Sequence, residues 1–331
     1  MASILADALH QSSIVIDGLI ISKWSRDVFE QMHKGGLTAA NCTCSVWHGF
    51  NDTMTNIAEW KKMLAENSDI LTQVHSAADI RRAKEEKKVG IVLGWQNTFA
   101  LEQNVDHLYL FRDLGVRVMQ LTYNTQNLVG SGCWESRDSG LSDFGRDVID
   151  VMNELGILVD LSHVGDTTSA DAIAHSKKPV AYTHCFPNAI MDHPRNKSDE
   201  MMKMIADKGG FIGVVAYTPF MPKGDDSTVE DVLDGYEHII NLVGEDHVGI
   251  GTDFTPGYGV EFFQYLRSDK GQGRALSSGF AKRPDNPIGL DGPSEYVNLT
   301  EAMMKREWSE KRIRKVLGEN WLRFLEEVWG R

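Results

Sequence analysis

The chain has 331 residues, of which 42% are hydrophobic and 24% charged, and its formal net charge is −13 at pH 7. This length and apolar content allow one large core, and α/β barrels of this size commonly form one domain, so we expect residues 1–331 to be a single domain. The acidic balance argues against nucleic acid and anionic membrane as partners, and the lack of an 18-residue apolar stretch or a signal peptide favours a cytoplasmic protein.

Short β-branched runs alternate with amphipathic helical stretches along the chain. Apolar strands that alternate with helices indicate parallel pairing with helices outside, and eight such units close as a (β/α)8 TIM barrel. An open doubly wound sheet is the structural alternative, but it needs a Gly-rich phosphate turn after the first strand, and none follows Asp17-Gly18. The predicted strands are Ile14–Ile21, Ala39–Val46, Val89–Trp95, Val116–Thr122, Ile157–Leu161, Pro179–Thr183, Phe211–Ala216 and His247–Thr252.

The predicted barrel spans about residues 13–295, and closing helices follow over about 296–329. Long loops come after the fourth and eighth predicted strands, over about residues 124–142 and 255–293. Barrel active sites are built from strand-to-helix loops, so side chains in these loops and at strand ends are the first candidates for chemistry.

Three of the predicted strands end in residues that suit a metal-hydrolase site. His163 and His184 follow consecutive apolar runs, and Asp253 follows the eighth run. Imidazole is the commonest neutral metal ligand, and a nearby carboxylate can bind metal or accept a proton from metal-bound water. The three side chains therefore suggest one cavity.

In these residues the chain resembles the membrane dipeptidase (renal dipeptidase, peptidase M19) family of the amidohydrolase superfamily, from about Ser13 to Trp329. The resemblance implies a metal-dependent amidohydrolase barrel, usually a homodimer, in which two zinc ions cleave dipeptides with a free C-terminal carboxylate. The motifs are Asp160-Leu161-Ser162-His163, Thr183-His184, His193-Pro194-Arg195-Asn196 with Asp199, Gly249-Ile250-Gly251-Thr252-Asp253-Phe254 and Gly318-Glu319-Asn320-Trp321.

The resemblance also implies roles for individual residues. His163 and His184 match ligands of one zinc, and Asp253 matches the carboxylate that contacts metal and water. Arg195 matches the clamp on the substrate carboxylate, a task that suits the planar fork of a guanidinium.

The departures from the family pattern gather around the metals. Leu19 and Ile21 stand where the family has a His-x-Asp pair, and Gln96 stands where it has the bridging Glu. An amide oxygen is a weak, neutral zinc donor, so we expect at most one zinc, held by His163, His184 and Asp253 with Gln96 as a weak ligand, or none. Leu19 and Ile21 are expected to form an apolar wall opposite these ligands.

Two residues of the loop after the fourth strand are candidates for substrate contact. Tyr123 stands where the family has a substrate-facing His; it could donate a hydrogen bond to a developing oxyanion or simply pack. Asn124 could orient substrate or satisfy the backbone of a turn.

Three functions remain open. The leading hypothesis is a dipeptidase-like hydrolase of an amide bond in a small carboxylate-bearing substrate, with one zinc, Asp253 as base and Arg195 as anchor. The second is a metal-free barrel enzyme, a lyase or isomerase, in which Asp253 and a His carry out acid–base catalysis. The third is a ligand-binding barrel without activity.

Overall fold

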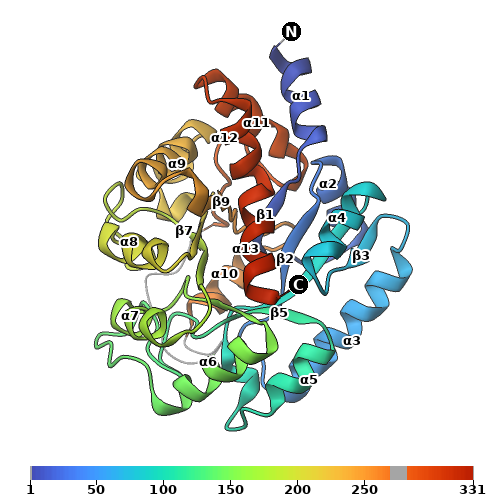
Figure 1. Ribbon diagram of the computed structural model, residues 1–331. Helices are drawn as coiled ribbons and strands as arrows, with labels where there is room; N and C mark the ends of the chain where they lie inside the picture. The colour runs from blue at the N-terminus through green and yellow to red at the C-terminus, as the bar shows by residue number, and fades with distance from the viewer. Residues whose placement is uncertain (1, 269–281, 331) are drawn as a thin grey trace.

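Eight parallel strands close into a barrel in the computed structural model, which describes residues 2–268 and 282–330 (Figure 1). β1 pairs with β2 and β9, and β2 pairs directly with β4, which closes the ring and confirms the (β/α)8 fold. All eight predicted strands are present. They are β1 (Ile16–Ile20), β2 (Ala39–Ser45), β4 (Val89–Trp95), β5 (Val116–Gln120), β6 (Leu158–Asp160), β7 (Ala181–Cys185), β8 (Phe211–Val214) and β9 (Val248–Ile250).

A further strand, β3 (Leu71–Gln73), lies outside the ring. It pairs with residues 89–91 at the start of β4, whereas β5 pairs with residues 93–95 near the end of the same strand. Three residues are too few to show an alternating pattern, so nothing in the sequence distinguishes this segment from a loop.

Helices cover the outside of the barrel (Figure 1). Several begin at residues that cap them: the Ser142 side chain accepts from the Gly145 N–H, and Thr228 and Asp231 form a capping box. The helices are α1 (Ala2–Ser12), α2 (Arg26–Lys34), α3 (Phe50–Glu66), α4 (Ala77–Glu85), α5 (His107–Asp113), α6 (Asp143–Leu155), α7 (Asp166–His175), α8 (Asp199–Asp207), α9 (Val229–Val243), α10 (Val260–Arg267), α11 (Tyr296–Lys305), α12 (Glu310–Arg314) and α13 (Asn320–Trp329).

The last helix, α13, lies across the amino ends of the strands, and Figure 1 shows it crossing the centre of the barrel. Trp321, Phe324 and Leu325 pack there against the first residues of several strands, among them Ile16 and Phe211. Their burial contributes on the order of 2 kcal/mol for each large side chain. The floor of the barrel is therefore closed, and only the carboxyl ends of the strands remain available for a site.

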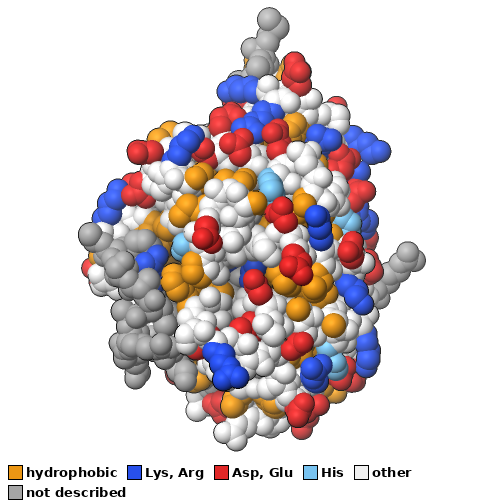
Figure 2. All heavy atoms as spheres, turned by 90° about the vertical axis from the view of Figure 1, so that its left-hand side faces the viewer, with side chains coloured by type: hydrophobic (Ala, Val, Ile, Leu, Met, Phe, Trp, Pro, Cys, Tyr) orange, Lys and Arg blue, Asp and Glu red, His pale blue; other side chains and the backbone are white. Residues whose placement is uncertain are grey.

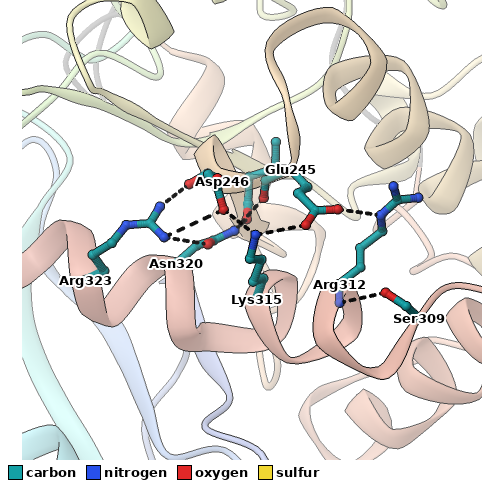
Figure 3. Close-up of polar contacts among 8 residues, drawn as sticks. Glu245, Asp246, Ser309, Arg312, Lys315, Asn320 and Arg323 are labelled. Carbon is teal, nitrogen blue, oxygen red and sulfur yellow. Dashed lines mark hydrogen bonds and ion pairs between the residues drawn. The ribbon is translucent and has the colours of Figure 1, made fainter.

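Ion pairs attach these closing helices to the turn before β9 (Figure 3). Lys315 lies 2.9 Å from a carboxylate oxygen of Glu245 and 2.6 Å from one of Asp246, and Arg312 lies 2.8 Å from the other oxygen of Glu245. The Asn320 side chain also donates to the backbone oxygen of Glu245. Single surface pairs contribute little, but this connected group fixes the position of α13 under the barrel.

Three glycines make room in the barrel interior. A Cβ atom at Gly213 or Gly251 would lie 2.0 Å from the backbone oxygen of Thr183, and one at Gly18 would lie 2.3 Å from it. Any side chain at these positions would displace β7 at the residue before His184.

Charged residues of both signs mix on the face of the molecule shown in Figure 2, and that face shows no continuous basic patch. Within residues 2–268 and 282–330, no helix combines the length and the apolarity that crossing a membrane requires.

Candidate active site

A cavity of about 60 Å³ lies at the carboxyl ends of the strands, opposite α13. It brings together six of the seven residues singled out from the sequence, and the seventh, His184, is fully buried behind His163. The six lining residues are Gln96, Tyr123, Asn124, His163, Arg195 and Asp253.

His163 and His184 point at each other: their Nε2 atoms are 3.1 Å apart. Burial lowers the pKa of both imidazoles well below the usual value, and the nearby Arg195 guanidinium lowers it further. Both rings are therefore neutral near pH 7, and each has one protonated nitrogen and one lone pair.

Asn124 fixes the proton of His163. Its side-chain oxygen lies 2.7 Å from Nδ1 of His163, and because an amide oxygen can only accept, Nδ1 carries the proton. Asn124 has a left-handed backbone with φ 61°, a conformation that Asn adopts more easily than most residues. The lone pair of His163 is therefore on Nε2.

A chain of hydrogen bonds fixes the proton of His184 in the same way. The buried Asp160 carboxylate accepts from the backbone N–H and hydroxyl groups of both Ser162 and Thr183. Burial raises the pKa of Asp160, and the hydrogen bonds from Ser162 and Thr183 oppose that shift. The two backbone N–H groups on Oδ1 can only donate, and they favour the carboxylate form. The Thr183 hydroxyl donates to Asp160, so it accepts from Nδ1 of His184, 2.8 Å away.

Both Nε2 lone pairs therefore face one another. Two nitrogens bound to one tetrahedral zinc at 2.0–2.1 Å would be about 3.3 Å apart, close to the observed separation. The pair thus offers two of the ligands that zinc takes, each with its second nitrogen hydrogen-bonded, as is usual for metal-binding histidines. Within the described part of the chain, however, no group of three or more His, Cys, Asp or Glu side chains is placed to hold a metal ion.

Asp253 projects a carboxylate into the cavity from a strained backbone with φ 59°. Among the described residues, no hydrogen bond or ion pair to this carboxylate is observed. Burial raises its pKa to about 7, although Arg195 opposes the shift. A carboxyl group that titrates near neutral pH is suited to take up and return a proton.

Arg195 is almost fully buried, and most of its fork binds the protein itself. Nη1 donates to the backbone oxygen of Ser162 at 2.5 Å, and Nη2 donates to that of His184 at 2.7 Å. Nε is buried and has no hydrogen-bond partner within the described residues. Arg195 therefore braces the two strand ends that carry the imidazoles, and its side chain also lines the cavity.

Lys197 is a second buried cation that the sequence motifs did not single out. Its ammonium donates to the backbone oxygen of Val164 at 2.6 Å and lies 5.0 Å from the centre of the Tyr182 ring. Burial lowers its pKa. The sequence offered one signal that Lys197 belongs to the site, namely its position two residues after Arg195. A Lys followed by Ser and Asp, however, has the sequence pattern of an exposed residue.

Tyr123 stacks on the His163 ring with centroids 4.2 Å apart, and burial raises its pKa well above the usual value. Tyr123 is thus a neutral phenol at the cavity. Gln96 donates its side-chain N–H to the Thr43 hydroxyl at 3.1 Å, and its side chain lines the cavity.

The apolar wall is built partly from other residues than expected. Ile21 lines the cavity and clusters with Trp47, Tyr123 and Leu266. Leu19 is buried but is not among the lining residues. The apolar side of the cavity therefore includes Leu266 and Phe263 on α10, from a segment distant in sequence.

A closed parallel barrel with paired imidazoles, a carboxylate and a buried guanidinium at its strand ends defines an amidohydrolase-type barrel. The chain belongs to the membrane dipeptidase family (peptidase family M19), whose model matches residues 26–264 and 258–329.

Solved structures and curated proteins agree with this assignment. An amidohydrolase from Pseudomonas aeruginosa is 53% identical, with a TM-score of 0.96 over 98% of this chain and 99% of that one. A metallopeptidase from Rhodobacter sphaeroides, solved with a phosphinate mimic of L-Ala-D-Ala, shares the fold at 21% identity, with a TM-score of 0.81 over 96% of this chain and 100% of that one. The dipeptidase tcpJ of Claviceps purpurea is 30% identical over 281 residues. The match covers 84% of this chain but only 60% of that protein's length.

Proposed function

We propose that the protein hydrolyses an amide or peptide bond in a small substrate that carries a carboxylate, with a single zinc ion held by His163 and His184. The observation that supports this most strongly is the convergence of two neutral imidazole lone pairs, each fixed by a hydrogen bond at Nδ1. A pair of zinc ions does not fit, because Leu19, Ile21 and Gln96 stand where the family resemblance implies further metal ligands. One ion does fit the imidazole pair, with water and substrate as further ligands.

In this proposal the zinc, when bound, supplies a Lewis acid that activates water and polarises the scissile carbonyl. Asp253 takes a proton from the attacking water and returns it to the leaving nitrogen, a role that its pKa of about 7 permits. The Tyr123 hydroxyl donates a hydrogen bond to the developing oxyanion. Arg195 holds the substrate carboxylate, and Asn124, which lines the cavity, orients His163.

The test is metal content measured together with hydrolysis. Protein purified without chelator is expected to contain about one zinc per chain, and His163→Ala is expected to lose both zinc and activity. His48→Ala, which removes a half-buried imidazole outside the cavity, serves as the matched control. Wild-type protein without zinc, together with a His163→Ala variant of normal activity, would refute the proposal.

A metal-free acid–base enzyme is the second candidate, and the lack of a third protein ligand within the described residues favours it. Asp253 and the His163–His184 pair would then exchange protons with a substrate in a lyase or isomerase reaction. Full activity after exhaustive chelation supports this candidate over the zinc hydrolase. Thermal stabilisation by small carboxylates without turnover would indicate a binding protein instead.

We also propose that the chain is one domain, acts as a homodimer and is cytoplasmic. A single cooperative unfolding transition, a mass of twice 37.0 kDa by light scattering and recovery in the cytoplasmic fraction are the expected results.

A further inference from the structure

Four basic side chains gather around the amino end of β5, away from the end of the barrel that carries the cavity. They come from different elements: Lys61 from α3, His75 from the bend between β3 and α4, Arg112 from α5 and Arg117 from β5. The charge of His75 interacts with those of the other three, so the four groups lie close together. Figure 1 shows α3, β3 and α5 at the edge of the barrel where this group lies.

Two strands share one edge of β4, and this arrangement creates the place where the basic groups meet. β3 pairs with residues 89–91 of β4 and β5 pairs with residues 93–95, so β3 ends where β5 begins. Gly115 directly precedes β5, and a Cβ atom there would lie 2.2 Å from Nε2 of Gln73 and 2.7 Å from Cε1 of His75. Because Gly115 has no side chain, Gln73 and His75 can lie directly on the start of β5. We call the group that meets here the β3–β5 junction, and it consists of Lys61, Gln73, His75, Arg112 and Arg117.

Neutral oxygen atoms hold two of the long side chains of the junction in place. Nζ of Lys61 donates to Oε1 of Gln73 at 2.6 Å, and Nε2 of Gln73 donates to the backbone oxygen of Leu114 at 3.2 Å. Nε of Arg112 donates to the backbone oxygen of Leu155 at 2.8 Å. These hydrogen bonds fix the directions of the two cations but do not neutralise their charges.

Arg117 forms the buried side of the junction, with only 3% of its surface exposed. Its Nε donates to the backbone oxygen of His75 at 2.6 Å, whereas Nη1 is buried and has no hydrogen-bond partner within the described residues. Burial lowers the pKa of Arg117 to about 10, and the nearby charge of Arg112 contributes to the shift. The guanidinium is therefore still charged at pH 7, and a buried charged donor without a partner is unfavourable until a ligand supplies an acceptor.

Asp79, one of two carboxylates whose charges reach the junction, has its own partners. It accepts from the backbone N–H groups of His75 and Ser76, both at 2.9 Å, and lies 2.6 Å from a guanidinium nitrogen of Arg82. These contacts cap the start of α4. Asp79 is therefore engaged outside the junction.

Asp113, the second carboxylate, is exposed and acts on Arg112 and Arg117 only at longer range. Within residues 2–268 and 282–330, no carboxylate oxygen lies within 4.0 Å of a side-chain nitrogen of Lys61, Arg112 or Arg117. One exposed carboxylate thus stands against three cations. The junction is positively charged, although the chain as a whole has a net charge of −13.

We propose that the β3–β5 junction binds a phosphate group, either inorganic phosphate or the phosphate of a small monoester, between Lys61, Arg112 and Arg117. Three cations that approach from three elements match a tetrahedral dianion better than a planar carboxylate with one charge. Lys61 and His75 are exposed, so the ligand enters from solvent and Arg117 contacts it from the interior. His75 is neutral near pH 7, because burial and the neighbouring cations lower its pKa, and it can donate one ring N–H. The site is independent of the proposed hydrolysis, which is assigned to the other end of the barrel.

Calorimetric titration in chloride buffer tests the proposal with three probes: inorganic phosphate, glycerol 3-phosphate and acetate. The wild type is expected to bind about one phosphate per chain and to bind acetate at least about tenfold more weakly. Lys61→Gln and Arg112→Gln are each expected to weaken phosphate binding about tenfold, because each removes a charge-assisted hydrogen bond. The matched control is Lys62→Gln, which removes the neighbouring exposed cation on α3, 3.8 Å from Glu66, and is expected to keep the affinity.

The ester probe identifies the source of the phosphate. Equal affinity for both phosphates supports inorganic phosphate as the ligand, and tighter binding of glycerol 3-phosphate supports a monoester. Thermal unfolding in the same solutions removes the general salt effect, which acts on all variants alike, whereas stabilisation by a bound phosphate is lost in Lys61→Gln. No binding up to about 10 mM phosphate, equal affinity for acetate, or phosphate binding that neither Lys61→Gln nor Arg112→Gln weakens overturns the proposal.

Discussion

Asp160→Asn is expected to reverse the tautomer of His184. Oδ1 of Asp160 accepts from the backbone N–H groups of Ser162 and Thr183, at 3.0 and 3.1 Å, so the amide oxygen of the new Asn must occupy this position. Its NH2 group then takes the place of Oδ2, which lies 2.7 Å from the Thr183 hydroxyl. Because NH2 only donates, the hydroxyl turns its proton toward Nδ1 of His184, and the proton of His184 moves to Nε2.

The size of the effect follows from the bonds that form. Nε2–H of His184 would point at Nε2 of His163, 3.1 Å away, in a neutral hydrogen bond worth about 1 kcal/mol. Restoring the functional lone pair means breaking this bond and the new Thr183–Nδ1 bond, together about 2 kcal/mol, or about 30-fold in activity. Stability changes by only about 1 kcal/mol, because all four contacts of residue 160 keep a hydrogen bond.

Long-range 1H–15N spectra of the imidazoles report the tautomer directly, and kcat/KM reports its consequence. Asp150→Asn, which changes a surface carboxylate paired with His175, is the matched control. If His184 in Asp160→Asn keeps its proton on Nδ1 and activity stays within twofold of wild type, the hydrogen-bond reasoning is wrong.

Three further results are expected. Asn124→Gly keeps the left-handed backbone but removes the acceptor, so it should lower activity about 10–100-fold. Asn124→Asp keeps an acceptor and should retain the Nδ1 proton of His163 in the same spectra. Equal effects of the two variants would contradict the assignment of the proton to Nδ1. The pKa of Asp253 is raised from 3.8 to about 7, so its contribution to stability is present below pH 4 and is lost as pH rises through 7. In urea titrations, Asp253→Asn should therefore gain up to about 4 kcal/mol of unfolding free energy at pH 8 and nothing at pH 4. The kcat/KM of the wild type should rise with pH, with a midpoint near pH 7. Gly213→Ala should destabilise the fold by about 2 kcal/mol, because its Cβ would lie 2.0 Å from the backbone oxygen of Thr183. An unchanged urea midpoint would contradict this, because it would mean that β7 shifts to accommodate the Cβ without loss of stability.

The barrel could be predicted because short runs rich in apolar and β-branched residues alternate with helical stretches along the chain. β3 could not, because three residues carry no pattern, and it is held by pairing with β4, which is a tertiary contact. The strand ends were equally clear: His163, His184 and Asp253 follow apolar runs, and the carboxyl ends of parallel strands meet at one end of a barrel.

What could not be predicted depends on directions of side chains and on partners distant in sequence. The fork of Arg195 binds backbone oxygens of Ser162 and His184, and backbone groups leave no mark in the sequence. Lys197 reads as an exposed lysine until the folded chain places it under Val164. Arg267 lies in a long loop whose folding as α10 against the cavity is decided by tertiary packing.

The position of α13 has a consequence for how the chain folds during synthesis. Trp321, Phe324 and Leu325 fill the floor of the barrel and follow all of its strands in the chain, so they are synthesised after them. The early strands, beginning with Ile16, therefore keep exposed apolar amino ends until α13 has been synthesised, and the nascent barrel is vulnerable to aggregation for the whole of that time. In the cell, yield should depend on chaperones that shield an open barrel more than on the rate of any single folding step.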